Sequence, residues 1–250
     1  MRAPLAYQPF VLISTARTGS SLLWSYLNSH PDILCLRGIY GSRSKINFGK
    51  HYKELPEEFS SNQLIKLRNE QPIEFLAKYV WKQYPTALKA VGFKYFYNHN
   101  RHLLDKNSII NYLKYSENIK FIHLKRENLL DVLFSYTRAL SQNKWTHTDE
   151  EFETTFTIQE CTSFFNEIRQ SQQLYDLLFN KRMIQIKYED LLTRPGQTLS
   201  LVQEFIGAEI ADLTAETRRN TKVNLSRSIT NYKELKAYFN QTEYSAFFIE

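Results

Sequence analysis

The chain has 250 residues, of which 42% are hydrophobic and 14% aromatic. This composition supports a sizeable folded core and excludes intrinsic disorder. Lys and Arg number 32 against 26 Asp and Glu, a formal net charge of +6. That excess suits an anionic small ligand and is too small to indicate nucleic-acid binding. An ordinary basic surface explains the total equally well, so the positions of the charges must decide.

No linker rich in Pro, Gly or Ser divides the chain, so we predict a single domain over residues 1–250. Cys35 and Cys161 lie far apart and belong to no metal-binding or redox spacing, which favours a reducing compartment. The N-terminus lacks the apolar core of a secretory signal, and no segment is long enough to span a bilayer. We therefore expect a cytoplasmic protein without stable membrane insertion; the sequence carries no signal of oligomeric state.

The first element is an apolar run, Phe10–Ser14, typical of a strand. The loop from Ser14 to Ser21 holds one Gly, one Arg and five Ser or Thr residues, and helical spacing follows to Leu27. Free backbone N–H groups at the start of such a helix, together with its dipole, can bind a phosphate or sulfate. The alternative is a plain strand-to-helix connection capped by Thr18 or Ser20.

This loop differs from the nucleoside-triphosphate motif G-x-x-x-x-G-K-[ST]. Ser14 replaces the first Gly, and Ser20 replaces the Lys that would reach the terminal phosphates. The chain also has no G-x-G-x-x-G dinucleotide motif. The loop therefore favours a phosphate held without a metal, by backbone N–H groups, hydroxyls and Arg17; a P-loop kinase of atypical loop sequence is the alternative.

Strand-like and helical patterns alternate along the rest of the chain. Further strands are predicted at Ile33–Leu36, Leu88–Tyr95, Ile119–Leu124 and Met183–Tyr188. Helices are predicted at Ile73–Trp81, Leu103–Tyr115, Leu129–Leu140, Ile158–Phe179 and Leu199–Ile206. The alternation predicts an α/β, P-loop-like three-layer fold with a central parallel sheet of about five strands flanked by helices. Gly38–Ser61 and Ala211–Asn231 lack periodicity and are expected to be long binding or lid-like loops.

A second basic segment, Phe121–Ser135, repeats the strand-to-helix arrangement. Asn128 and Asp131 form a capping pattern, so the helix should begin there. Arg126 then lies at the carboxyl end of the strand and Ser135 about two turns into the helix, where both could reach one phosphate. The simpler alternative is a capped helix with a solvated Arg.

With both segments in view, the chain resembles the sulfotransferases that use 3′-phosphoadenosine-5′-phosphosulfate (PAPS). It is most similar to the soluble bacterial branch acting on carbohydrates, the nodulation-factor and trehalose sulfotransferases. The motifs that carry this resemblance follow the family's order over nearly the whole chain. They are Ala16–Ser21, Leu27–Ile33, Gly92-Phe93-Lys94, Arg126-Glu127-Asn128 with Ser135, Tyr188–Leu191 and Asn231–Leu235.

The resemblance implies metal-independent, in-line transfer of a sulfuryl group from PAPS to a hydroxyl of a small molecule or carbohydrate, with the desulfated nucleotide PAP as product. The residues implied for the 5′-phosphate and the sulfuryl group are Arg17, Thr18, Gly19, Ser20 and Ser21. Arg126 and Ser135 would bind the 3′-phosphate. Tyr188 would lie near the adenine, unless it is a core aromatic residue at a strand end. Lys222, in a lid-like segment of about residues 211–231, would close over the nucleotide, with Arg218, Arg219 and Arg227 as competitors.

The chain departs from the family where the proton acceptor is expected. Many bacterial relatives have Gly-Glu shortly after the second strand, and here the sequence is Arg37-Gly38. His99 is the first candidate for a substitute base, followed by His123 and His102, because His titrates near neutral pH. Lys94 would hold the bridging oxygen of the leaving group, unless it is an exposed strand-end Lys. The missing Glu also leaves open a catalytically degenerate nucleotide-binding protein, and a more acidic acceptor such as a phenol would need less help.

Overall fold

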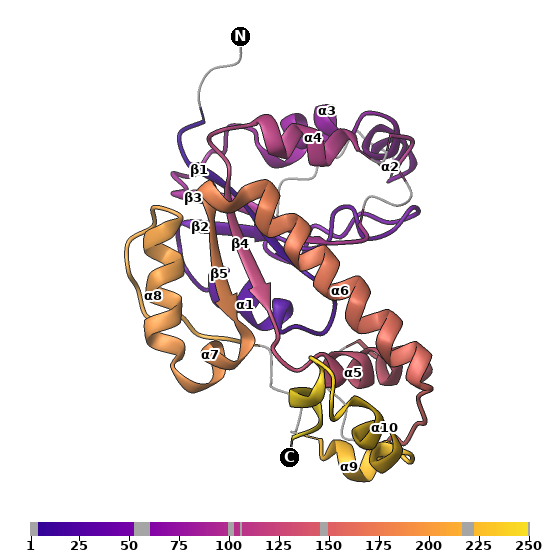
Figure 1. The fold of residues 1–250 in the computed structure, drawn as a ribbon. Coiled ribbons are helices and arrows are strands. Elements are labelled where there is room, and N and C mark those ends of the chain that lie inside the picture. The colour runs from indigo at the N-terminus through magenta and orange to yellow at the C-terminus, as the bar shows by residue number, and fades with distance from the viewer. Residues whose placement is uncertain are drawn as a thin grey trace.

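The computed structural model of the protein describes residues 5–52, 61–99, 103–105, 107–145, 150–216 and 223–249. A central sheet of five parallel strands lies between helices (Figure 1). The strands are β1 (Gln8–Ser14), β2 (Ile33–Leu36), β3 (Ala90–Phe96), β4 (Lys120–Lys125) and β5 (Met183–Lys187), in the order β2-β3-β1-β4-β5. The predicted α/β fold is confirmed, and all five strands lie close to their predicted bounds.

The described helices begin with α1 (Ser20–Leu27), α2 (Ser61–Glu70), α3 (Pro72–Phe75), the π-helical turn η1 (Leu76–Val80) and α4 (Ser108–Tyr115). They continue with α5 (Leu129–Ser141), α6 (Ile158–Phe179), the 3₁₀ turn η2 (Asn180–Arg182), α7 (Tyr188–Thr193) and α8 (Pro195–Phe205). The C-terminal part contains α9 (Leu225–Ser228), α10 (Tyr232–Phe239) and the 3₁₀ turn η3 (Ser245–Phe248). Within the described ranges, no helix is both long and apolar enough to cross a bilayer.

The alternation of side chains along β1 gives the sheet two buried faces. Val11 and Ile13 belong to an apolar cluster that includes residues of α4 and α6, whereas Phe10 and Leu12 pack in a cluster with α1 and α8. A third cluster joins α5 and α6 to the C-terminal elements. Figure 1 shows α5, α9 and α10 gathered at one end of the molecule, with α2, α3 and α4 at the other.

Several helices differ from the predictions. The helix predicted at Leu103–Tyr115 begins only at Ser108, and the one predicted at Ile73–Trp81 becomes α3 followed by the π turn η1. The loop predicted at Gly38–Ser61 ends where α2 begins, and α2 was not predicted because its sequence is mostly polar. Its apolar stripe is therefore too narrow to be recognised from periodicity.

The predicted N-cap of α5 is confirmed. The Asn128 side chain accepts hydrogen bonds from the N–H groups of Leu130 at 2.9 Å and Asp131 at 3.1 Å. The Asp131 carboxylate does not complete a capping box but pairs with Arg126. Asp131, whose N–H is held by the cap, thus also contacts Arg126 of the second basic segment.

Candidate active site

The loop from Ser14 to Ser21 leaves the carboxyl end of β1, the middle strand of the sheet, and enters α1 through Gly19. Gly19 is the N-cap residue with φ of 84°, and no side chain caps the helix. The alternative of a cap from Thr18 or Ser20 is therefore wrong. Thr18 Oγ1 instead donates to the Thr15 carbonyl at 2.8 Å, which braces the loop internally. The start of α1 is left without a side-chain cap, as an anion-binding helix terminus requires.

Tyr188 covers this loop. A Cβ atom at Gly19 would lie 2.2 Å from Tyr188 Cδ2, so only glycine permits the contact. The guanidinium of Arg126 lies over the same ring, with its central carbon 4.9 Å from the ring centroid. Tyr188 is the first residue of α7 rather than the last of β5, and it is half-buried. The ring therefore connects the two predicted phosphate sites instead of filling the core.

Arg17 joins the two sites directly. Its backbone has φ of 67°, a left-handed conformation that is uncommon outside glycine. The side-chain Nε donates to Ser135 Oγ at 2.9 Å, and Nη1 donates to the Trp145 carbonyl at 2.8 Å. Arg126 Nη1 donates to the Arg17 carbonyl at 3.3 Å. Ser135, expected beside Arg126, thus contacts Arg17, and the predicted 5′ and 3′ sites form one basic cluster.

Arg126 has an unused donor in this cluster. Its Nη2 lies 2.9 Å from Asp131 Oδ2, but its buried Nε has no hydrogen-bond acceptor in the part of the chain that the structure describes. Leaving a buried donor unpaired costs about 1–3 kcal/mol, so such groups call for an explanation. An acceptor oxygen supplied by a bound ligand would satisfy it.

Arg138 belongs to the same cluster and was not predicted. It lies one turn after Ser135 on α5 and is 6% exposed. The pKa of Arg17 is lowered by burial first, then by the nearby cations of Arg138 and Arg126. The signal that could have identified Arg138 is its spacing of three residues from Ser135, which places both on one face of the helix.

Lys94 lies in β3, 6% exposed, and its Nζ donates to Ser21 Oγ at 3.3 Å. The alternative of an exposed strand-end Lys is therefore wrong. Burial, reinforced by the cation of Arg37, lowers the pKa of Lys94 to about 7. Arg37 itself is held over the Trp24 ring, 4.2 Å from its centroid. Lys94 thus titrates closer to neutral pH than an exposed lysine does.

His99 is 6% exposed, and its ring lies against two glycines. A Cβ atom at Gly38 would lie 3.0 Å from His99 Cε1, and one at Gly41 would lie 3.1 Å from His99 Nε2. The Phe96 ring lies 4.6 Å away, and the same ring lies 5.2 Å from Lys94 Nζ. The imidazole therefore occupies the space that a side chain at position 38 would need, where the bacterial family pattern has its Glu.

His123 lies in a different environment. It is fully buried in β4, with Nε2 at 2.7 Å from the Tyr97 hydroxyl and Nδ1 at 2.8 Å from Asp176 Oδ1. Burial, reinforced by the cation of Lys125, lowers its pKa to about 4. Because both ring nitrogens are engaged inside the protein, His123 is a structural residue. His102 lies outside the described residues.

The lid-like segment is described at its two ends. The N–H groups of Thr214 and Glu216 donate to Ser29 Oγ and Ser25 Oγ, so this end of the segment contacts α1 and the turn that follows it. Residues 223–226 line a pocket of about 370 Å³ that also includes Asp131, the partner of Arg126. Lys222, Arg218 and Arg219 lie outside the described residues, whereas the competitor Arg227 lies exposed in α9.

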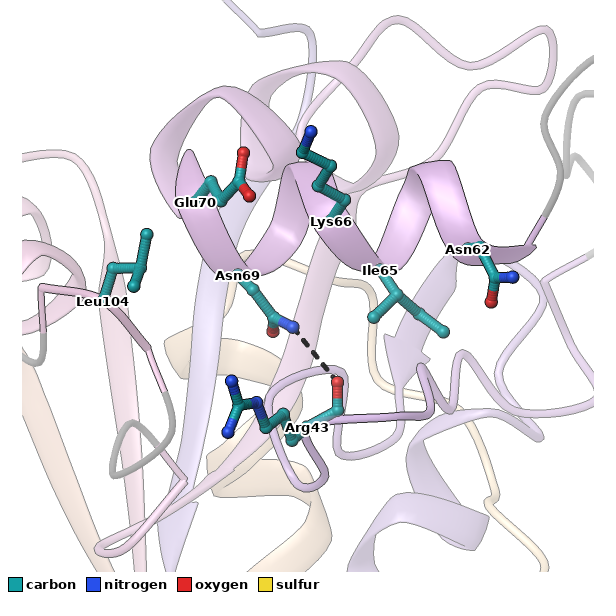
Figure 2. Close-up of a pocket in the computed structure, with 7 residues that line it drawn as sticks. All are labelled: Arg43, Asn62, Ile65, Lys66, Asn69, Glu70 and Leu104. Carbon is teal, nitrogen blue, oxygen red and sulfur yellow. Dashed lines mark hydrogen bonds between the residues drawn. The ribbon is translucent and has the colours of Figure 1, made fainter.

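A second pocket, of about 350 Å³, lies between α2 and the loop after β2 (Figure 2). Its lining consists of Arg43, Asn62, Ile65, Lys66, Asn69, Glu70 and Leu104. The buried guanidinium of Arg68 donates to the carbonyls of four loop residues: Ile39, Ser42, Arg43 and Lys45. The loop lies against His99 through Gly38 and Gly41 and lines the pocket through Arg43, so it borders both places.

Comparison with known proteins shows which family the chain belongs to. The sequence model of the sulfotransferase family matches residues 9–212. Nodulation protein H from Rhizobium tropici is 25% identical over 96% of this chain and 93% of its own length, and the Rhizobium meliloti protein of that name is 22% identical over 96% and 95%. A crystal structure of a sulfotransferase from Alicyclobacillus acidocaldarius shares the fold, with a TM-score of 0.52, 16% identity and coverage of 92% of this chain and 90% of that one. With most of its length matched by the family model, the chain belongs to the sulfotransferase family.

Proposed function

We propose that the protein, acting as one domain over residues 1–250, transfers a sulfuryl group from PAPS to an acceptor hydroxyl. The observation that carries the proposal is the single cluster of Arg17, Ser135 and Arg126. In this cluster the buried Arg126 Nε has no hydrogen-bond acceptor among the described residues. PAPS has phosphate groups on both sides of its ribose, which suits two adjoining basic sites. Family membership favours sulfuryl over phosphoryl transfer, as does Ser20 at the kinase Lys position.

The donor would be held from both sides of the cluster. The uncapped start of α1, with Gly19, Ser20 and Ser21, would bind the 5′-phosphate. Arg126 would bind the 3′-phosphate, with Ser135 close by through its bond to Arg17. Tyr188, which contacts Gly19 and Arg126, would lie near the adenine. Lys222 would close over the nucleotide.

The transfer itself would be an in-line displacement without a metal ion. The acceptor oxygen bonds to sulfur as the bond from sulfur to the 5′-phosphate oxygen breaks, and that electron pair leaves with the phosphate. His99 takes the acceptor proton, and protonated Lys94 donates a hydrogen bond to the departing bridging oxygen. The position of His99 against Gly38 supports the first role, and the contact of Lys94 with Ser21 supports the second.

The acceptor would be a carbohydrate or another small polyhydroxylated molecule. The pocket under α2 supports this class, because amide and charged side chains dominate its lining and Ile65 and Leu104 add a small apolar surface. Its volume of about 350 Å³ falls at the lower end for ligand pockets. The buried, free thiols of Cys35 and Cys161 suit a cytoplasmic setting.

An acceptor screen tests the proposal. The protein is incubated with PAPS carrying labelled sulfate and with panels of saccharides and phenols, with and without EDTA. We expect label on at least one saccharide, undiminished by EDTA, and PAP binding in calorimetry. PAP binding without transfer to any hydroxyl would favour the degenerate nucleotide-binding protein, and binding of ATP but not PAP would favour the kinase.

A further inference from the structure

We infer that the acceptor is an acidic saccharide, whose negatively charged group is bound by Arg37 and the other cations of the loop after β2. The inference rests on the proposed function and adds the charge of the acceptor, which that function does not specify. Its support comes from the charge of the loop, from the position of Arg37 beside Lys94, and from the way in which the loop is held.

The segment formed by β2 and the loop after it carries charge of one sign. From residue 33 to residue 53 the sequence holds five Lys or Arg residues and no Asp or Glu, although the whole chain has 32 basic and 26 acidic residues. Four of the five lie within the described ranges: Arg37, Arg43, Lys45 and Lys50. Lys50 pairs with Glu216, whereas the other three form no ion pair with a described residue. A surface of one sign attracts and concentrates ligands of the opposite sign.

Arg37 is the most firmly held cation of this loop. Its guanidinium carbon lies 4.2 Å from the centroid of the Trp24 ring, and a Cβ atom at Gly49 would lie 3.2 Å from its Cγ. Its backbone N–H donates to the Phe48 carbonyl at 3.2 Å. The side chain is half-buried, so its stem is enclosed while part of it remains accessible. A cation held in this way loses little conformational freedom when it binds an anion.

The register of the sheet places Arg37 beside Lys94. Leu36 of β2 pairs with Phe93 of β3, so the next residues of the two chains, Arg37 and Lys94, are neighbours about 5 Å apart along the sheet. The lowered pKa of Lys94, for which Arg37 is the largest cause after burial, agrees with this proximity. Neither cation pairs with a carboxylate among the described residues. An anion that contacts both would offset their mutual repulsion.

The order of the strands assigns this anion to the acceptor. The donor is proposed to bind at the junctions that follow β1 and β4. Arg37 follows β2, which lies two strands beyond β1 on the side away from β4, about 10 Å along the sheet. In an in-line displacement the acceptor approaches sulfur from the side opposite to the departing phosphate. The residue after Arg37 is Gly38, which meets the ring of His99, the proposed base for the acceptor.

Arg43 extends the same charge to the pocket between α2 and the loop (Figure 2). The lining of that pocket contains two cations, Arg43 and Lys66, against the single carboxylate of Glu70. Arg68 holds this part of the loop through backbone carbonyls, among them those of Arg43 and Lys45. The exposed side chains of Arg43 and Lys45 are therefore not needed to hold the loop and are available to a ligand. The positive charge thus reaches from the end of β2 to the proposed acceptor pocket.

Matched acceptors test the inference. With PAPS as donor, kcat/KM is measured for uronic acid, sulfated and phosphorylated oligosaccharides, each beside its neutral counterpart. For the uronic acids the counterpart is the methyl ester, which removes the charge and keeps the ring hydroxyls. The assays are run below pH 7, where Lys94 is protonated. We expect at least one acidic saccharide to exceed its counterpart by about tenfold at low ionic strength, and the difference to shrink at high salt.

Charge variants identify the residues responsible. Arg37→Gln should lower kcat/KM for the acidic saccharide by about tenfold, while the neutral counterpart and PAP affinity stay within about twofold of wild type. Arg37→Lys should keep part of the preference because it keeps the charge. The double variant Arg43→Gln/Lys45→Gln should show a smaller loss of the same kind, since both side chains are exposed. Lys236→Gln removes an exposed cation on α10, at the other end of the molecule, and should match wild type.

Several results would overturn the inference while leaving the proposed function in place. They are transfer to neutral saccharides or phenols as fast as to acidic saccharides, and an acidic preference that survives in Arg37→Gln. Equal losses on acidic and neutral acceptors, or a loss of PAP affinity, would assign Arg37 to the donor or to folding and also overturn it. Wild-type protein that transfers sulfate to no hydroxyl would overturn the proposed function together with the inference, so the two failures are distinguishable.

Discussion

The proposed donor side and the proposed acceptor side of this site are built in different ways. The donor side consists of two strand-to-helix junctions, at Gly19 and at Arg126, in which each key residue lies a fixed number of residues from a strand end. The acceptor side depends on contacts between distant segments, such as His99 against Gly38 and Arg68 beneath the loop after β2. Local junctions can be identified from spacing alone, whereas contacts between distant segments require the fold. The four experiments below test this contrast.

The largest effect is expected on the acceptor side, from His99→Ala. Loss of a general base lowers kcat by about 10²–10⁴-fold. PAP affinity should stay unchanged, because the ring packs against Tyr95, Phe96 and the glycines of the loop after β2. The double variant His99→Ala/Gly38→Glu places a carboxylate in the vacated space and should recover part of kcat. Steady-state kinetics with the best acceptor from the screen provide the measurement.

Gly38→Glu alone is the matched control, because its side chain would meet the His99 ring. It should lower activity, and a fully active His99→Ala enzyme would remove His99 from the mechanism.

On the donor side, Arg126→Ala should weaken PAP binding by about 2–5 kcal/mol, since the phosphate would lose a partly buried, charge-assisted partner. Titration calorimetry gives this value directly. Lys187→Ala is the control, because its pair with Glu127 lies exposed near the same end of the sheet. Equal PAP affinity in wild type and Arg126→Ala would show that the second phosphate site is misassigned.

A smaller effect is expected on the pH dependence of activity, through the protonation of Lys94. Its lowered pKa, about 7, means that the amine is protonated below pH 7 and loses its proton above it. If the protonated form assists departure of the phosphate, kcat/KM for PAPS should fall as the pH rises through 7. Arg37→Gln removes a neighbouring cation, so the pKa of Lys94 should rise and this fall should move to higher pH. A pH profile that is identical in the two proteins, or displaced to lower pH, would contradict the role of Lys94.

The smallest effect is expected on acceptor binding in the pocket between α2 and the loop after β2. The double variant Asn62→Ala/Lys66→Ala removes two exposed side chains and should raise KM for the saccharide acceptor by about threefold to tenfold, equivalent to one or two hydrogen bonds, with kcat unchanged. Lys236→Ala, an exposed substitution on α10 at the other end of the molecule, is the control. Equal KM values for a saccharide in the double variant and in wild type would place the acceptor elsewhere.

The same contrast explains how much the sequence could predict. The strands were recognisable because each is a short apolar run, and Arg17, Arg126 and Asn128 because each lies at a junction with characteristic spacing. Arg68 and Arg138 were not recognised, since an isolated Arg in a helix looks the same whether it faces water or the interior. Tyr188 was assigned to the end of a strand, although it begins α7 and its contacts with Gly19 and Arg126 exist only in the folded sheet. The fold and the two strand-to-helix junctions were therefore predictable, while the contacts between those junctions were not.

Arg68 has a consequence for how such an enzyme could change its specificity. The guanidinium holds the loop after β2 only through backbone carbonyls, which every amino acid provides. The side chains of Ser42, Arg43 and Lys45 are therefore not needed to keep the loop in place. Substitutions there can alter the chemistry of the pocket while the contact of Gly38 with His99 is preserved. The loop is thus a natural starting point for directed evolution toward new acceptors.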